Sequence, residues 1–128
     1  MSDPVDLTPL ETKIAERYAA AAIEHGACSE TGNYKVGNAA YDRMTKARHD
    51  LKKLPDRGLA VLMTLIQHPS DRVKSAAGTH LLSLNEQLGC AVLERLLDNP
   101  SRHIAIDAKW ILREWRAGHL STIRELGE

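Results

Sequence analysis

The sequence predicts an all-α fold, an α-α superhelix in which helical hairpins stack side by side as a solenoid. Three observations predict it. Apolar residues recur at three- and four-residue spacing, capping residues and prolines separate the apolar segments, and a stretch long enough for two helices occurs twice. A chain of 128 residues also fits one domain that buries a core of its own.

The first helix is predicted from its start signal. Thr8 stands at a cap position, Pro9 follows at the first helical position, and Glu11 lies three residues after the cap, a combination that satisfies otherwise unpaired amide groups. We expect this helix over residues 8–25. Gly26 is expected to end it and to begin a loop.

The second helix is predicted over residues 34–54, where apolar residues form a narrow seam at helical spacing and Pro55 marks the end. Its opposite face is polar, and we treat that face as a candidate polar and basic surface. Its members are Lys35, Asn38, Asp42, Lys46, His49 and Lys53.

The most specific signal is an internal repeat with an offset of 31 residues, which aligns residues 59–84 with residues 90–115 without a gap. Each copy reads as an apolar helix, a Pro-Ser turn and a second helix with an alanine, Ala77 or Ala108, where the paired helices cross. We expect both alanines to be buried, as members of an inward stripe in each second helix. The stripes are Val73, Ala77, His80, Leu81 and Leu84 in the first copy and Ile104, Ala108, Ile111, Leu112 and Trp115 in the second. The identical pairs are Ala60/Ala91, Val61/Val92, Leu62/Leu93, Leu65/Leu96, Pro69/Pro100, Ser70/Ser101, Ala77/Ala108 and Leu81/Leu112.

Such a unit cannot bury its apolar face alone, and stacking on a neighbour completes the core. We therefore predict a single domain over residues 1–128, built of about three hairpins and a short C-terminal cap. Its parts are a helix pair at 8–54, repeats at 56–84 and 86–116, and a cap or tail at 117–128. Within the repeats we expect helices at 56–68, 71–84, 86–98 and 101–116, and a capping segment near 120–126.

The repeat resembles HEAT and armadillo repeats, because residues 69–77 read PSDRVKSAA. The second copy departs from that pattern at Ala105, where a basic residue is usual. Residues 32–42 (GNYKVGNAAYD) and 65–69 (LIQHP) make the chain similar to an uncharacterised bacterial domain-of-unknown-function family of small HEAT-like proteins. The resemblance spans about Leu7 to Trp115. It implies the fold and says nothing about catalysis.

No motif points to catalysis, a metal or a cofactor. The six histidines fall in no metal-binding frame, and the tightest group, His25 with Cys28, offers only two ligands. We expect His25 to interact with the last carbonyls of its helix, and His80, on an apolar stripe, to be buried. Phosphate-cradling glycine loops and the G-x-S-x-G elbow are absent from the sequence. We expect a protein that is not an enzyme and needs no cofactor.

Charge leaves two readings open. Basic and acidic residues number 17 each, but residues 1–34 carry a net charge of −4 and residues 35–57 a net charge of +4. This asymmetry suits either two complementary neighbouring helices or the steering of a partner. The alternative partner is a nucleic-acid backbone, bound by the basic segment 43–57, although acidic residues interrupt that segment. Its basic members are Arg43, Lys46, Arg48, Lys52, Lys53 and Arg57.

Another protein is the preferred partner. The repeat aligns polar Ser75 and Thr79, which are expected to face water, with Ile106 and Trp110. The second copy thus has two large apolar side chains where the first has polar ones. Aromatic residues and arginine are enriched at binding hot spots. The candidate protein interface comprises Arg102, His103, Ile106, Trp110 and Arg113.

For Ile106 and Trp110 themselves we favour a terminal cap, in which the segment with Leu120, Ile123 and Leu126 folds back over them. An open interface is the alternative. The function predicted with an open interface is a non-catalytic protein-interaction module, with an adaptor and a toxin-neutralising protein as the roles considered.

The expected location is the cytoplasm, with thiols Cys28 and Cys90 reduced. The cysteines follow no paired pattern, residues 1–4 lack the features of a secretory signal, and no apolar run is long enough to cross a bilayer. The sequence gives no indication of oligomeric state.

Overall fold

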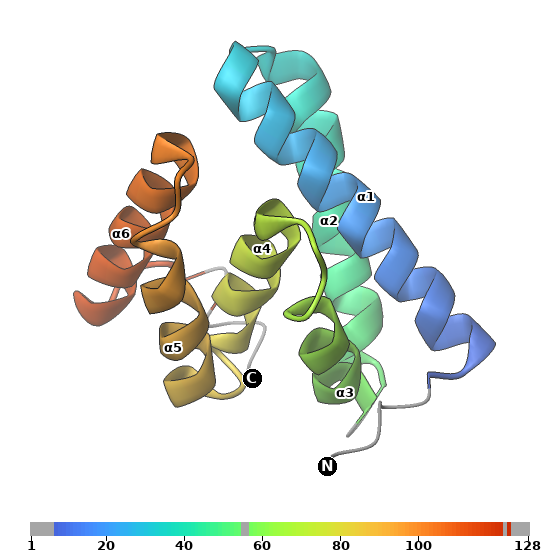
Figure 1. The fold of residues 1–128 in the computed structure, drawn as a ribbon. Coiled ribbons are helices and arrows are strands. Elements are labelled where there is room, and N and C mark those ends of the chain that lie inside the picture. The colour runs from blue at the N-terminus through green and yellow to red at the C-terminus, as the bar shows by residue number, and fades with distance from the viewer. Residues whose placement is uncertain (1–6, 55–56, 122, 124–128) are drawn as a thin grey trace. The chain divides into compact units, whose positions relative to one another are not determined.

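The computed structural model describes residues 7–54, 57–121 and 123, and within these residues it is all-helical, with six principal α-helices and no strand (Figure 1). The helices are α1 (Pro9–Thr31), α2 (Tyr34–Lys52), α3 (Arg57–Leu65), α4 (Asp71–Leu81), α5 (Glu86–Leu96) and α6 (Arg102–Arg116). Each predicted helix is present. None of the helices in the described part of the chain is long and apolar enough to cross a membrane.

The chain divides into two compact units, Met1–Gln67 and His68–Glu128. In the first unit α1 packs along α2, and α3 contacts both. In the second unit α5 contacts α4 and α6, and α4 also contacts α6. The division falls inside the first copy of the sequence repeat.

The start of α1 follows the prediction, and its end does not. Thr8 Oγ1 accepts a hydrogen bond from Glu11 N at 3.2 Å, and Thr8 N donates to Glu11 Oε1 at 2.9 Å, so the capping box is confirmed. The predicted loop at Gly26 is wrong, because α1 continues to Thr31 and ends at Gly32 with φ 78°. One glycine inside a helix costs only about 1 kcal/mol, which the packing of the longer helix against α2 outweighs.

The first unit has a core between α1 and α2 that combines several alanines with larger side chains. Its buried members include Ile14, Tyr18, Ala21, Ala22, Ala40, Met44, Ala47 and Leu51. Alanines allow the two helices to lie close together. Two charged residues, Glu11 and Arg48, are also buried, which the sequence did not indicate. Arg48 Nε donates to the Tyr18 hydroxyl at 3.3 Å, and its guanidinium lies 5.8 Å from the centre of that ring.

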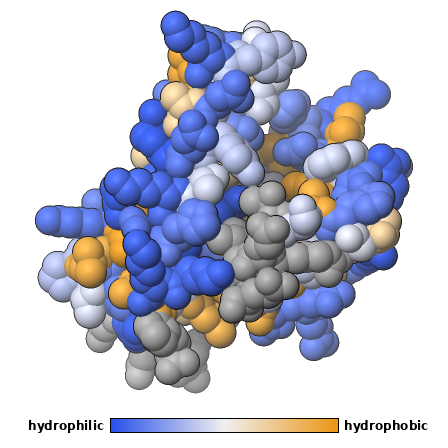
Figure 2. Space-filling view, turned by 180° about the vertical axis from the view of Figure 1, so that it is seen from behind, coloured by the Kyte–Doolittle hydropathy of each residue, from blue (hydrophilic) through white to orange (hydrophobic). Residues whose placement is uncertain are grey.

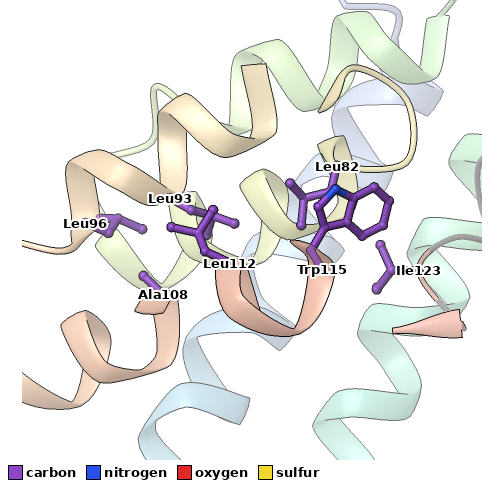
Figure 3. Close-up of a cluster of buried hydrophobic side chains, with 7 residues drawn as sticks. All are labelled: Leu82, Leu93, Leu96, Ala108, Leu112, Trp115 and Ile123. Carbon is purple, nitrogen blue, oxygen red and sulfur yellow. The ribbon is translucent and has the colours of Figure 1, made fainter. Parts of the chain in front are cut away.

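The second unit has a continuous apolar cluster (Figure 3). The cluster joins side chains of α5 and α6 to two residues that lie beyond helix ends, one after α4 and one after α6. Its members are Leu82, Leu93, Leu96, Ala108, Leu112, Trp115 and Ile123. Ala108, like its repeat equivalent Ala77, has no exposed surface, so the expected burial of both alanines is confirmed.

The 31-residue offset is visible in the packing of each unit. A Cβ atom added to Gly58 would lie 2.7 Å from the carbonyl oxygen of Leu51, and one added to Gly89 would lie 2.7 Å from the backbone nitrogen of Leu82. Gly58 and Gly89 are 31 residues apart, and so are Leu51 and Leu82. The end of α2 therefore approaches α3 in the first unit much as the end of α4 approaches α5 in the second, and only glycine permits that distance.

The turns before α4 and α6 also repeat. His68 Nδ1 accepts from Ser70 N at 2.9 Å, and Asn99 Oδ1 accepts from Ser101 N at 2.8 Å. The imidazole nitrogen thus takes the place of the asparagine oxygen in the same local turn. Asn99 also donates from Nδ2 to Asp71 at 2.7 Å, which ties the start of α4 to the turn before α6.

Two expectations about α4 are wrong. Leu84 was expected to face inward but is 44% exposed, because α4 ends at Leu81 and the stripe does not continue. Thr79 was expected to face water but is buried, and its hydroxyl donates to the carbonyl of Ser75 at 2.7 Å. This back-bond satisfies the Thr79 hydroxyl donor and allows the side chain to be buried.

Candidate protein interface

Helix α6 has two unlike sides, and its inner side belongs to the core of the second unit. Ala108, Leu112 and Trp115 recur at helical spacing and lie in the apolar cluster, with Ile104 and Ile111 packed against it. The predicted inward stripe of α6 is confirmed. This packing fixes the rotation of α6 about its axis and so decides which residues point outward.

The outer side of α6 carries the two large apolar residues singled out in the sequence. Ile106 is 56% exposed and Trp110 is 46% exposed, whereas Trp115, five residues further on, is 5% exposed. Ile106 and Trp110 lie one turn apart and so share a face. Exposed apolar residues also occur elsewhere, and in the view of Figure 2 they form small separate groups among hydrophilic residues.

The structure brings all five predicted interface residues to the exposed surface of α6, since Arg102, His103 and Arg113 are exposed beside Ile106 and Trp110. The cap that we favoured for this face is not what the described residues show, because Ile106 and Trp110 are exposed. Ile123 lies in the cluster with Trp115, and Leu120 packs against the same cluster. Leu126 lies outside the described residues.

One further residue belongs to this face and was missed. Lys109 is exposed and lies three residues after Ile106 and four before Arg113, so it continues the same row of the helix. The three cations Arg102, Lys109 and Arg113 form a basic flank beside Ile106 and Trp110. The signal that could have revealed Lys109 is its alignment with Gly78, 31 residues earlier.

The opposite flank of this face is acidic. It holds Asp107 and Glu114, of which Glu114 is only partly exposed and is hydrogen-bonded to His119 Nδ1. Arg113 Nε lies 4.0 Å from Glu114 Oε1, and its side chain is 69% exposed, so this contact is weak and solvated. Arg102 and Lys109 are both exposed. The basic flank therefore presents most of its charge to solvent.

The 31-residue register shows what this face corresponds to in the other helices. Leu51, Leu82 and Arg113 are successive equivalents, and the first two are buried where they meet Gly58 and Gly89 of the next helix. Gly78 corresponds to Lys109, and a Cβ on Gly78 would lie 2.8 Å from Val92 of α5. Lys109 and Arg113 thus lie on the side of α6 that corresponds to the packing sides of α2 and α4. On that side α2 packs against α3, and α4 packs against α5.

The candidate polar and basic surface of α2 is exposed at all six positions, namely Lys35, Asn38, Asp42, Lys46, His49 and Lys53. The basic segment 43–57 is less available than its composition suggests. Arg43 pairs with Glu24, and Arg48 is buried against Tyr18. Arg57 forms a two-pronged ion pair with a further carboxylate, described next.

Glu11 and Arg57 connect the start of α1 to the start of α3. Arg57 Nη2 donates to Glu11 Oε1 at 2.7 Å, and Arg57 Nε donates to Glu11 Oε2 at 2.8 Å. These hydrogen bonds, together with the one from Thr8 N, lower the pKa of Glu11 from 4.5 to about 2. The sequence did not indicate this pair, because the two residues are 46 positions apart.

The histidines do not assemble a metal site in the described part of the chain, where no three His, Cys, Asp or Glu side chains lie close enough together to hold an ion. His80 is buried, as expected. The expectation for His25 is wrong, because α1 continues beyond it, and its ring centre lies 5.5 Å from that of Tyr41. Cys28 and Cys90 form no disulfide, and burial raises the pKa of the Cys90 thiol.

Comparison with known proteins adds one relationship. A family model described as a domain of unknown function (DUF2019) matches residues 13–115. No curated protein and no solved structure matches the chain.

Proposed function

The chain belongs to the family described as a domain of unknown function (DUF2019), and we propose that it is a non-catalytic protein-interaction module of HEAT-like architecture. Its binding surface is the outer face of α6, made by Arg102, His103, Ile106, Trp110 and Arg113. An adaptor and a toxin-neutralising protein are both roles that such a module can serve.

The HEAT-like part of the proposal rests on the 31-residue register. The Leu51–Gly58 and Leu82–Gly89 approaches are equivalent, and so are the turns at His68 and Asn99. Equivalent backbone contacts at a fixed offset are what a stacked helical repeat requires, because each copy must present the same surface to the next.

The observation that carries the binding proposal is the exposure of Trp110 next to Ile106 and the arginines. A tryptophan left 46% exposed keeps much of its apolar surface in contact with water. Burying that surface against a partner is favourable by about 25 cal/mol for each Å² removed from water. Tryptophan and arginine together are the side chains most enriched at binding hot spots.

A non-catalytic role is supported by the chemistry of the reactive side chains that the structure describes. The Cys90 thiol has a raised pKa, which disfavours the nucleophilic thiolate. The lowered pKa of Glu11 comes from an ion pair that ties two helices together, and such structural pairs also perturb pKa values.

The nucleic-acid alternative gains no specific support. It relied on six basic residues in segment 43–57, and Arg43, Arg48 and Arg57 each contact a residue of the same unit. Backbone binding draws its affinity from cations that can neutralise phosphates, so three engaged arginines weaken it.

The proposal is tested with the full chain and a partner purified with it from the source cells. Trp110→Ala should abolish binding of that purified partner, while Lys53→Ala, at the exposed C-cap of α2, should leave it intact. Both variants must give the circular dichroism spectrum and cooperative unfolding of the parent. A partner that binds Trp110→Ala as tightly as the parent contradicts the proposal, and loss of binding in Lys53→Ala alone favours the α2 surface instead.

A further inference from the structure

The register of the helices limits what can occupy the outer face of α6. In the second unit, α5 packs against α4 at Gly78 and Leu82. A Cβ atom added to Gly78 would lie only 2.8 Å from Val92. At the equivalent positions α6 has Lys109 and Arg113. A helix approaching as closely as α5 approaches α4 would collide with the lysine side chain and would bury the arginine charge without a partner.

Lys109 and Arg113, which stand where α4 has Gly78 and Leu82, make the face suitable for a helix of another chemistry. Arg102, Lys109 and Arg113 lie along one flank, and all three are exposed. Ile106 and Trp110 lie beside them and are 56% and 46% exposed. A surface with a short apolar strip and a cationic border is complementary to a helix that has apolar residues on one stripe and carboxylates next to that stripe.

From this complementarity we propose that the occupant of the α6 face is an acidic amphipathic helix of another protein. The inference rests on the proposed function of this face and deepens it by naming the partner's chemistry. The apolar stripe of the partner covers Ile106 and Trp110. Its Asp or Glu side chains pair with Arg102, Lys109 and Arg113, and the arginines can bind a carboxylate through two parallel hydrogen bonds.

Two other occupants of the α6 face are disfavoured. The register disfavours a further repeat helix packed as α5 packs on α4, and the charge pattern disfavours a polyanion. Asp107 and Glu114 border the other side of the same strip, and their carboxylates would repel phosphates that approached the basic flank. A helix with charges on one border and neutral residues on the other avoids that repulsion.

The experiment is a selection from a displayed library of helical peptides with randomised surface positions. The bait is the full chain, and peptides that bind Trp110→Ala are removed. The inference predicts enriched peptides that combine apolar residues at positions i, i+3 or i+4, and i+7 with Asp or Glu beside them. A synthetic copy of such a peptide should bind about tenfold more weakly to Lys109→Glu or Arg113→Glu. Lys53→Glu, a charge change at the C-cap of α2, is the matched control and should bind like the parent.

Each other outcome separates the two proposals. If the selected peptides require Trp110 but are not enriched in acidic residues, the proposed binding face stands. The proposal that its partner is an acidic helix is then overturned. Absence of any Trp110-dependent peptide contradicts both. A concentration-dependent dimer that Trp110→Ala abolishes would also overturn the proposal of an acidic helix. A second copy of the chain would then occupy the face. Tighter binding of a duplex oligonucleotide than of any selected peptide, again lost in Trp110→Ala, overturns that proposal as well.

Discussion

Arg57 binds the carboxylate of Glu11 through two hydrogen bonds of 2.7 and 2.8 Å, although the two residues are 46 positions apart. Glu11 also completes the cap of α1 by accepting from Thr8 N. One side chain thus serves both the local start of a helix and the attachment of α3 to α1.

The first prediction concerns this pair and pH. Glu11→Gln keeps a side chain that can still complete the cap and removes the charge opposite Arg57. The pKa of Glu11 is lowered from 4.5 to about 2 in the folded protein. The charge therefore stabilises the fold fully above pH 4.5, and that contribution is lost as the pH falls from 4.5 toward about 2.

The measurement is urea unfolding of parent and variant across this pH range. The parent should be more stable near neutral pH, and the difference in free energy of unfolding should shrink as the pH falls. Glu16→Gln, an exposed position on α1, is the control and should show no such convergence. A difference that stays constant with pH would mean that the Glu11 charge contributes nothing.

A second prediction tests the core of the second unit. Ala108 has no exposed surface and lies among Leu93, Leu96 and Leu112 (Figure 3). Ala108→Arg inserts a large charged group with no partner there, and we expect a loss of about 4 kcal/mol or more in unfolding free energy. Ala117→Arg, at an exposed site just after α6, should change stability by about 0.5 kcal/mol or less. Equal stability of the two variants, measured by chemical denaturation, would show that the register of α6 is wrong.

Gly89 provides a third prediction, because the usual effect of its substitution should change sign. In an open helix Gly→Ala stabilises by up to about 1 kcal/mol. At Gly89 the new methyl group would lie 2.7 Å from the nitrogen of Leu82 and 2.9 Å from the carbonyl oxygen of Gly78. Backbone atoms cannot move aside cheaply, so Gly89→Ala should destabilise the protein by about 1 to 3 kcal/mol.

The equivalent change in the first unit, Gly58→Ala, should have the same sign, since its methyl group would meet the Leu51 carbonyl at 2.7 Å. Gly37→Ala is the milder comparison, with its nearest contact a side-chain carbon of Cys28 at 3.1 Å. If thermal unfolding showed that Gly58→Ala or Gly89→Ala stabilises the chain, the close approach of successive helices would be refuted.

Much of the helical structure could be predicted from the sequence, because its signals are local. The cap at Thr8, the Pro-Ser turns and the apolar stripes each act within a few residues. The errors arose where tertiary packing outweighs local preference. Gly26 reads as a helix end, yet the packing of α1 on α2 carries the helix to Thr31. Leu84 continues a helical stripe in the sequence, but α4 has already ended at Leu81.

The members of the candidate site could be predicted from the sequence except for one cation, Lys109. Ile106 and Trp110 stood out because they replace Ser75 and Thr79, and this signal survived although Thr79 itself is buried. Lys109 gave no signal by itself, since an exposed lysine on a helix is ordinary. Its alignment with Gly78 is a signal in the sequence, but the meaning of that signal appears only in the structure, where Gly78 meets α5.

The central claim is that Trp110 lies on an open binding face while Trp115 supports the fold, and the most direct test is the unfolding free energy of Trp110→Ala beside that of Trp115→Ala. Trp115 is 5% exposed and packs with Leu82 and Ile123, so its loss should cost about 3 to 5 kcal/mol. Trp110 is 46% exposed, and its loss should cost about 1 kcal/mol or less. A cost for Trp110→Ala as large as that for Trp115→Ala would contradict the account, because Trp110 would then be a structural contact rather than part of an interface.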